Sequence, residues 1–267
     1  MPWDYKGIGE AKFFMSPIDS THSPNFLFFR LHAKFISVQK ISLYHKNKSV
    51  VCLLMINLRN QIRQVYELSD VQHITHLDNL KDILTDGCIF SKNQMLNLGK
   101  QSKDISNESV QTGRANITIP CSGKPLHDYV PLYWGKKTPM VSSLRKINDS
   151  LLFLIFSTEL LSKYDCLISD GNARSTKTQF KKFSQLNDLD ILDCKSINTS
   201  KYAHDDEIKR RKQSELLVLN KLPLHHLLRI ICYSQAVKNK VETLLATHCT
   251  TCSVYVGLGN YYYMDNQ

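Results

Sequence analysis

Residues 126–140 read LHDYVPLYWGKKTPM and are the most distinctive segment of this chain of 267 residues. Aromatic residues stand here beside two prolines and a glycine. Proline removes a backbone donor and glycine loosens the backbone, so this mixture is typical of neither a regular helix nor a simple strand. We therefore predict irregular backbone within this segment and regular elements on either side of it.

On the N-terminal side, a strand and a helix are predicted in succession. The strand is residues 71–75, a short run that includes apolar and β-branched residues. In residues 76–84 the apolar side chains have the spacing of one helical face, and Gly87 follows as the residue that ends the helix. Residues 90–113 are polar with few apolar side chains, which predicts a long surface loop.

On the C-terminal side, short strands and helices are intermixed. The candidates are a buried strand at residues 151–156, a turn at 170–173, an apolar segment that begins at 215–219 and stops at Pro223, a strand at 227–233 and a helix at 235–246. Their order lacks the regular spacing of βαβ units. The sequence therefore predicts an α+β fold around one central core.

The charge balance favours acidic partners. The chain has 34 Lys and Arg against 24 Asp and Glu, which gives a formal net charge of +10. Nucleic acid is the commonest partner of such a chain, although a basic surface that only faces water explains the charge equally well. No apolar run approaches the roughly 20 residues that span a bilayer, and the first residues lack the pattern of a secretory signal. We expect a cytoplasmic protein.

Eight cysteines are scattered through the chain, most of them singly in apolar stretches. This distribution is typical of small buried side chains in a reducing compartment and not of a disulfide framework. Cys249 and Cys252 have the spacing of metal ligands, but a zinc site needs two more, for which only His225 and His226 are candidates. We therefore predict no metal.

Three segments are distinguished along the chain. Residues 1–57 mix Pro, Ser, His and Lys with aromatic clusters and show no sustained period. We interpret them as an N-terminal extension that is either disordered or upstream of the true start, for which Met55 is a candidate; a genuine N-terminal subdomain is the alternative. Residues 58–250 form the predicted domain, and residues 251–267 are a C-terminal tail.

Four motifs are distinctive: VQHITHLDNL at residues 71–80, LHDYVPLYW at 126–134, DGNA at 170–173 and KRRKQSELLV at 209–218. They resemble motifs of the DarT family of DNA-modifying toxins. In the last motif Ser214 stands where the family usually has alanine, and Leu216 where it has phenylalanine. The four motifs follow the family's order, so together they are far more specific than any one of them.

The resemblance implies an ADP-ribosyltransferase-like α+β fold, a split β-sandwich with flanking helices that binds NAD in the cleft between its two halves. It also implies transfer of ADP-ribose from NAD to a base of single-stranded DNA, thymine or, in another branch, guanine. Family members are toxins paired with a macrodomain antitoxin of the DarG type. Two alternatives stay open: an ADP-ribosyltransferase that acts on RNA or protein, and a non-catalytic basic module that binds nucleic acid.

Glu215 is the candidate for the catalytic carboxylate. Cleavage of the bond between nicotinamide and ribose develops positive charge on the ribose, which a nearby carboxylate stabilises. Glu215 stands where a charged segment gives way to an apolar one, so its side chain would be held on a rigid strand at the edge of a cleft. By the residues alone a surface glutamate is the simpler interpretation; the resemblance favours the catalytic one.

Arg114 matches the arginine that the family places at the end of its NAD-binding loop and treats as catalytic. The family gives it a part in removing the proton of the base. A guanidinium is a poor proton acceptor, because its pKa lies far above neutrality. We expect Arg114 to hold the pyrophosphate and to stabilise the anion that develops on the base; a solvated loop arginine is the alternative.

Further NAD contacts are expected on the first strand and after it. The side chains of His73 and Thr75 are two residues apart and face the same side of a strand, where they could bond the adenosine-side ribose. Without the resemblance, both would be read as core residues. The resemblance makes His73, Ile74 and Thr75 a binding element, and it implies further contacts at Asp82 and Phe90.

The basic run Lys209, Arg210 and Arg211 comes shortly before Glu215, where the resemblance places the end of a substrate-recognising loop. Single strands are commonly held by basic grooves together with stacked aromatic rings. We predict that these three residues bind DNA, with Tyr202 as an aromatic ring nearby. A solvated charged face is the alternative.

Overall fold

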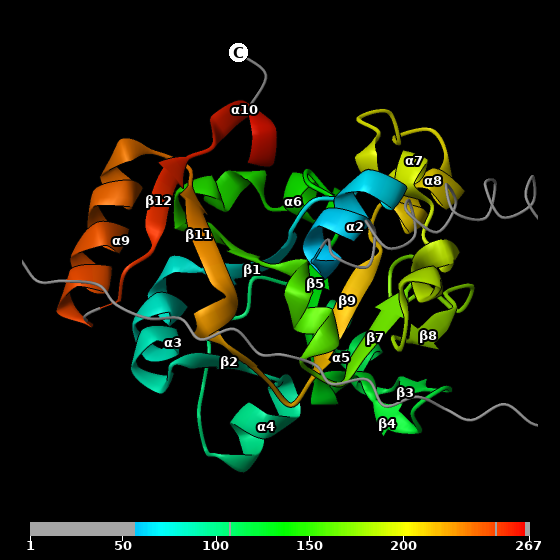
Figure 1. The fold of residues 1–267 in the computed structure, drawn as a ribbon. Helices are drawn as coiled ribbons and strands as arrows, with labels where there is room; N and C mark the ends of the chain where they lie inside the picture. The colour runs from blue at the N-terminus through cyan, green and yellow to red at the C-terminus, as the bar shows by residue number, and fades with distance from the viewer. Residues whose placement is uncertain (1–56, 107, 249, 265–267) are drawn as a thin grey trace, which may run out of the picture. The chain divides into compact units, whose positions relative to one another are not determined.

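The computed structural model describes residues 57–106, 108–248 and 250–264, so the proposed N-terminal extension lies outside the described residues except for its last one. The strands of the central sheet are β1 (Val71–His76), β5 (Tyr129–Tyr133), β6 (Leu151–Phe156), β7 (Cys166–Ser169), β8 (Phe180–Lys182), β9 (Glu215–Leu219), β11 (Leu227–Cys232) and β12 (Ser253–Val256). Their order is β12-β11-β6-β1-β5-β9-β7-β8 (Figure 1). Neighbouring strands are antiparallel except β11 and β12, which are parallel.

Short helices and two small strand pairs surround this sheet. The helices are α2 (Leu58–Tyr66), α3 (Leu80–Asp86), α4 (Lys92–Asn97), α5 (Glu108–Ala115), α6 (Pro139–Ser143), α7 (Cys194–Asn198), α8 (Asp206–Arg211), α9 (Gln235–Thr247) and α10 (Leu258–Tyr261). The 3₁₀ helices are η1 (Leu77–Asn79), η2 (Leu126–Asp128), η3 (Arg145–Ser150), η4 (Thr158–Ser162), η5 (Leu186–Ile191) and η6 (Leu224–His226). Strand β2 (Cys88–Phe90) pairs with β10 (Lys221–Pro223), and β3 (Thr118–Ile119) pairs with β4 (Lys124–Pro125).

The central sheet is almost divided between β1 and β5. Strand β1 pairs with β6 along all six of its residues, but it meets β5 at one register pair, Gln72 with Tyr133. The buried side chain of Gln72 donates to the Gly135 carbonyl at this same point. Beyond it the two strands are no longer paired, which leaves two half-sheets. The predicted α+β class, with its split sheet, is confirmed.

Strand β5 corrects the prediction of irregular backbone within residues 126–140. Turn η2 leads into this strand, and Thr138 then caps α6 by accepting from the Val141 amide. The Pro131 carbonyl accepts from His73 of β1 and therefore points toward the split. The backbone nitrogen and carbonyl of one strand residue point to the same side, so the missing N–H of Pro131 also faces the split. Proline therefore removes no ladder hydrogen bond here, and the strand tolerates it.

Residues 90–113 are also more regular than predicted, because they contain α4 and most of α5. The Ser91 hydroxyl accepts from the Gln94 amide and begins α4. Neither helix buries a residue below the surface. An apolar stripe, which is the usual sequence signal of a helix, is therefore absent from both.

The other predicted elements are present in the structure. Strand β6 is buried along its whole length, and α9 occupies the predicted helix at residues 235–246. Helix α3 ends at Gly87, whose φ of 64° is the left-handed conformation that glycine adopts without strain. The turn at residues 170–173 is also present, between β7 and β8.

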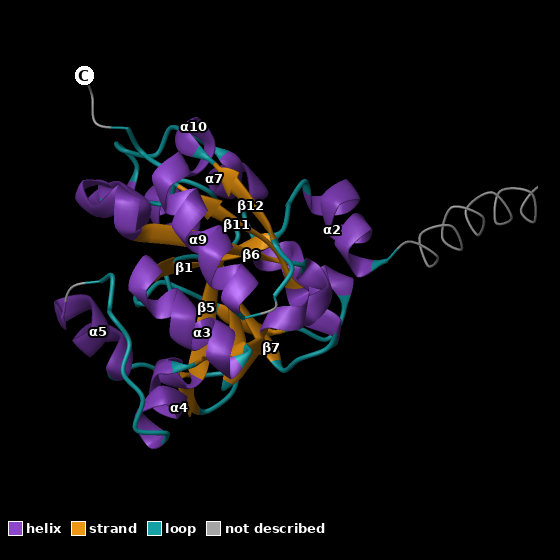
Figure 2. Cartoon of the chain, turned by 90° about the vertical axis from the view of Figure 1, so that its left-hand side faces the viewer, coloured by secondary structure: helices purple, strands orange, loops and turns teal. Residues whose placement is uncertain are grey.

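Two apolar layers cover the half-sheet of β1, β6 and β11. On one face Leu152 and Leu154 belong to the same core as Val241 of α9 and Leu80 of α3, and Figure 2 shows these two helices lying over the strands. On the other face Phe153 meets Tyr262 edge to face, with ring centroids 4.9 Å apart. Burial on both faces explains the unbroken apolar run of β6.

The segment after residue 250 is part of the fold. Strand β12 adds the outermost strand next to β11, and Tyr262 is fully buried, with its hydroxyl donating to the carbonyls of Leu151 and Ile231. Residues 251–264 therefore complete the core, and the boundary that the sequence placed at residue 250 does not coincide with the edge of the sheet.

Candidate active site

Arg114 and Glu215 form a two-pronged ion pair across 101 residues of sequence. Nη1 of Arg114 lies 3.0 Å from Oε1 of Glu215, and Nη2 lies 2.9 Å from Oε2. The Glu215 side chain is 1% exposed and that of Arg114 12%. Arg114 comes from the last turn of α5, and Glu215 is the first residue of β9. The structure thus brings the two predicted catalytic residues together.

The DGNA turn, residues 170–173, gives the carboxylate its third donor. The Ala173 amide donates to Oε1 of Glu215 at 3.1 Å. Behind it, the Ser169 hydroxyl accepts from the Glu215 amide at 3.0 Å and donates to the Gly171 carbonyl at 2.7 Å. The carboxylate is therefore fixed by donors from α5 and from this turn, while its backbone is fixed by β7.

Glu215 lies at the split in the sheet, because its register partner on β5 is Tyr133, the residue that also pairs with Gln72. Burial, reinforced by the Glu215 charge, raises the pKa of Tyr133, so its phenol stays protonated. Burial alone would lower the pKa of Arg114, but the charge and hydrogen bonds of Glu215 outweigh it and raise that pKa. Arg114 is therefore a permanent cation and no proton acceptor.

His73 reaches across the split. Its Nδ1 lies 3.0 Å from the Pro131 carbonyl, which can only accept, so Nδ1 carries the proton. Burial lowers the pKa of His73, against the opposing effect of this hydrogen bond. The ring is therefore neutral at pH 7, and its Nε2 offers a lone pair to a donor.

His127, the second residue of the LHDYVPLYW motif, is a polar group at the site that the sequence does not predict. Burial, and then the charges of Arg114 and Lys92, lower the pKa of His127. Its Nε2 is buried and has no hydrogen-bond partner among the described residues. A buried polar atom without a partner is uncommon in a folded protein, so this one is suited to a polar ligand. Only the motif's position before a strand could have singled it out.

The remaining predicted NAD contacts are spread around this centre. Ile74 packs in the apolar core with Phe153. The Thr75 hydroxyl accepts from the Asn79 side chain, which also bonds the backbone of Lys103 in both directions. These contacts fasten the segment that connects α4 and α5 to β1.

Asp82 and Phe90 lie outside the Arg114–Glu215 centre. Asp82 is exposed in the first turn of α3. Phe90 ends β2, with the Lys100 ammonium 5.8 Å from its ring centroid. Within the described part of the chain, no hydrogen bond or ion pair joins either residue to Arg114 or Glu215.

The basic run on α8 divides into buried and exposed members. Arg210 is 8% exposed and pairs with Asp170 and Glu207, which corrects the prediction that it faces DNA. Lys209 is exposed, and Arg211 is partly exposed beside Glu207. Only these two of the three predicted residues are therefore placed where a phosphate could reach them.

Two neighbours of this run also pack inward. Lys212 is 2% exposed and donates to the carbonyls of Ile197 and Thr199, and burial lowers its pKa to about 8. The Tyr202 hydroxyl bonds that of Tyr263, so the predicted stacking ring is tied to the C-terminal segment. Both contacts hold the chain between α7 and α8 against the rest of the domain.

The split sheet, with a glutamate fixed at the split and a neutral histidine across it, agrees with the ADP-ribosyltransferase-like fold that the resemblance implies. The model of the family described as "ssDNA thymidine ADP-ribosyltransferase, DarT" matches residues 72–263. The chain belongs to the DarT family, and the resemblance drawn from its four motifs is confirmed.

Relatives share the fold and much of the length. The DNA ADP-ribosyl transferase of Thermus sp. (strain 2.9) is 29% identical over 187 residues, 67% of this chain and 88% of that protein. The one from Escherichia coli O127:H6 is 28% identical over 206 residues, 72% and 93%. The solved structure "Thermus sp. 2.9 DarT in complex with ADP-ribosylated ssDNA" matches at a TM-score of 0.67 and 28% identity, over 73% of this chain and 97% of that one.

Two more relatives bear on co-substrate and partner. "Thermus sp. 2.9 DarT in complex with NAD+" matches at a TM-score of 0.62 and 28% identity, over 72% of this chain and 96% of that one. A fusion of DNA ADP-ribosyl transferase and DNA ADP-ribosyl glycohydrolase from Thermosipho africanus is 27% identical over 154 residues, 56% of this chain and 38% of the fusion protein.

Two features are absent from the residues that the structure describes. No helix among them is both long and apolar enough to cross a membrane. They also contain no group of three or more His, Cys, Asp or Glu side chains that could hold a metal ion. Cys249, one of the two cysteines with metal-ligand spacing, lies outside the described residues.

Proposed function

We propose that this chain transfers ADP-ribose from NAD to thymine in single-stranded DNA, with release of nicotinamide and with Glu215 as the catalytic carboxylate. The observation that carries this proposal is the buried carboxylate at the split in the sheet, held by three nitrogen donors. Its charge lies where positive charge on a ribose bound in the split would be stabilised. Membership of the DarT family supports the same reaction.

Arg114 has two tasks in this proposal. It bonds both oxygens of Glu215, a side chain that is 1% exposed, so Arg114 must shift for a ribose hydroxyl to reach the carboxylate. The freed N–H groups can then hold oxygens of the pyrophosphate, because the planar fork suits phosphate as well as carboxylate. Its permanent charge would also stabilise the anion on the base, while the proton of the base goes to another acceptor.

His73 orients the co-substrate in this proposal. Its Nε2 is a hydrogen-bond acceptor as long as the ring is neutral, and a ribose hydroxyl is a donor of matching chemistry. The unpartnered Nε2 of His127, beside Arg114, is a second polar group that a bound dinucleotide could satisfy. Both observations support NAD as the molecule that enters the split.

The biological setting follows from the relatives. Since a relative is a fusion with a glycohydrolase of the same modification, we propose that this chain is a toxin whose partner is a macrodomain antitoxin of the DarG type. We also propose that it works in the cytoplasm, where NAD and DNA are available to it. The six free cysteines of the described residues are compatible with a reducing compartment.

The reaction is tested by incubating the full chain with NAD and single-stranded oligonucleotides that each lack one base, followed by mass spectrometry. We expect one ADP-ribose on oligonucleotides that contain thymine and none on those without it. Modification that needs guanine would move the chain to the guanine-modifying branch. Modification of RNA or protein alone would show that DNA is not the acceptor. No release of nicotinamide at all would favour the alternative of a non-catalytic module that binds nucleic acid.

Glu215→Gln tests the carboxylate itself. Glutamine keeps the size of the side chain and an oxygen for the Ala173 amide but removes the charge. We expect nicotinamide release to fall by roughly 10²- to 10³-fold, the cost of one electrostatic contact in a transition state. NAD affinity and thermal unfolding are measured in parallel. Near-normal turnover in a folded variant would show that Glu215 is not the catalytic carboxylate.

A further inference from the structure

The Ala173 amide can fix Glu215 only if the DGNA turn is itself held in place, and Arg210 is the side chain that holds it. Nη1 of Arg210 lies 2.8 Å from Oδ1 of Asp170, and Nη2 lies 3.0 Å from Oδ2. The two side chains are 8% and 10% exposed. A forked pair of this kind fixes distance and orientation together, which a single contact does not.

The backbone of Arg210 holds the same turn. Its carbonyl accepts from the Asn172 amide at 2.9 Å. At Gly171 the turn packs so closely that an added Cβ would lie 2.4 Å from Nη1 of Arg210 and 3.0 Å from its carbonyl oxygen. Thr178, which donates to the Asn172 carbonyl at 2.7 Å, also accepts from Nη1 at 3.1 Å. Arg210 thus contacts three successive residues of the turn and its return.

Arg210 has no donor left for a phosphate. Its Nε donates to Oε2 of Glu207 at 2.9 Å, and Nη2 donates to Oε1 of Glu207 at 2.7 Å. With the bonds to Asp170 and Thr178, these account for all five N–H groups that a guanidinium possesses. A contact with DNA would require breaking a bond to one of the two carboxylates.

We propose that Arg210 is a positioning residue, which sets the Ala173 amide against Glu215 through the DGNA turn. The inference rests on the proposed catalytic role of Glu215. The order of contacts is Glu207 to Arg210, Arg210 to Asp170, Asp170 to the turn, and the Ala173 amide to the carboxylate. Loosening any one of these contacts moves the Glu215 carboxylate relative to the ribose and leaves the surfaces that bind NAD and DNA unchanged.

Arg210→Lys and Asp170→Asn test this inference, singly and together. Lysine cannot form the fork, and asparagine keeps an oxygen for the Gln179 amide but lowers the attraction to Arg210. We expect each to lower kcat of nicotinamide release by about 10²-fold, the cost of a small misplacement, while KM for NAD stays nearly constant. The double variant should be no slower than either single one, since both break one link.

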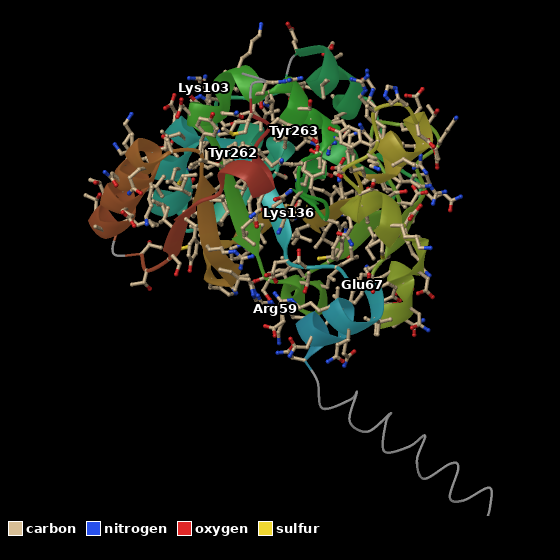
Figure 3. The ribbon with its side chains drawn as sticks, turned by 90° about the horizontal axis from the view of Figure 1, so that it is seen from above. Arg59, Glu67, Lys103, Lys136, Tyr262 and Tyr263 are labelled. Atoms are coloured by element: carbon tan, nitrogen blue, oxygen red, sulfur yellow. The ribbon has the colours of Figure 1, made fainter. Side chains whose placement is uncertain are left out.

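Arg59→Lys is the matched control. Arg59 forms a similar fork with buried Asp70, at 2.6 and 2.7 Å, from helix α2, and Figure 3 shows it with Glu67 at one edge of the domain. The Arg59→Lys variant should unfold at a lower temperature than the unaltered chain and keep the same kcat. A merely structural role of Arg210 predicts the same outcome for Arg210→Lys. If Arg210→Lys does not fold, Asp170→Asn decides the question by the same split between kcat and KM.

Two results would overturn the inference. One is a normal kcat in folded Arg210→Lys and Asp170→Asn while Glu215→Gln is inactive. The carboxylate would then be catalytic without the ion pair between Arg210 and Asp170. The other is weaker binding of single-stranded DNA, with a smaller salt dependence, in the charge-removing variant Arg210→Gln and not in Asp170→Asn, which would make Arg210 a phosphate ligand. An active Glu215→Gln would instead remove the proposed role of Glu215, on which the inference depends.

Discussion

Arg114 and Glu215 place opposite demands on their shared contact. The carboxylate needs the fork to stay ionised and oriented, but catalysis needs it to open toward the ribose. A buried ion pair costs desolvation, and removing one partner leaves the other charge uncompensated. The 1% exposure of Glu215 makes it the more constrained partner, whereas Arg114 reaches solvent and can turn toward a ligand.

Arg114→Ala and Arg114→Lys should separate charge from shape. We expect alanine to lower kcat/KM by roughly 10²-fold or more, because a preorganised cation at the reacting centre is lost. Lysine keeps the charge but not the planar fork, so it should restore only part of the rate. Steady-state kinetics of nicotinamide release, with exposed Arg145→Lys as the control, measures both. Full activity of Arg114→Lys would mean that any diffuse positive charge suffices.

His73 gives NAD binding a pH dependence with a defined sign. Its pKa is lowered by burial, so the folded protein takes up the proton only below the ordinary value near 6.5. The unfolded chain takes it up earlier, so His73 withdraws stability as pH falls through about 6.5 toward the folded pKa. Protonation also turns Nε2 from an acceptor into a donor.

We therefore expect the Kd for NAD to rise as pH falls from about 7 to about 5. Titration calorimetry of the full chain measures it. His73→Gln does not titrate, so its weaker binding should be flat over the same range, while His225→Gln, a surface control, should behave like the unaltered chain. Equal pH profiles for the His73 variant and the unaltered chain would contradict this assignment.

Among the helices and strands, the apolar pattern of the sequence predicted those that bury apolar side chains. The fully buried β6, the apolar face of α3 and the apolar positions of α9 all carry it. Helices α4 and α5 bury nothing, and β5 contains a proline that lies at a site without a ladder partner. These elements form because of caps and tertiary contacts, which periodicity does not report.

Helix α8 should bind DNA through its exposed face only. Replacing Lys209 and Arg211 with glutamine should weaken binding of single-stranded DNA and reduce the slope of log K against log salt by at most about 1.4, or roughly 0.7 for each lost phosphate contact. NAD affinity should not change. The control is the double variant Lys238→Gln with Lys240→Gln, on α9 at the other edge of the sheet (Figure 1), which removes the same two positive charges.

Fluorescence anisotropy of a labelled oligonucleotide at several salt concentrations measures both double variants. An equal loss of affinity in the α9 variant would mean that net charge, and not the face of α8, determines binding. An unchanged slope in the α8 variant would place the phosphate contacts elsewhere on the domain.

For the whole molecule, the sequence predicted the class and the two central residues, but not how they meet. The resemblance singled out both: Glu215 lies where it places the end of a substrate-recognising loop, and Arg114 matches the arginine at the end of the family's NAD-binding loop. The ion pair between Arg114 and Glu215 joins α5 to β9, and the ion pair between Arg210 and Asp170 joins α8 to the turn after β7. Contacts over such separations depend on the topology of the sheet, which one sequence does not reveal. The same limit explains why the basic run alone predicts DNA binding for Arg210, which the structure buries.

The acceptor should be an unpaired base, because the reacting groups lie below the surface. With Glu215 1% exposed and Arg114 12%, a base stacked in a duplex cannot reach them, and extruding it costs a few kcal/mol. A hairpin with one thymine in its loop and one in its stem tests this within a single molecule. We expect mass spectrometry to find ADP-ribose on the loop thymine, and on the stem thymine only after the hairpin melts. Equal modification of both below the melting temperature would rule this out.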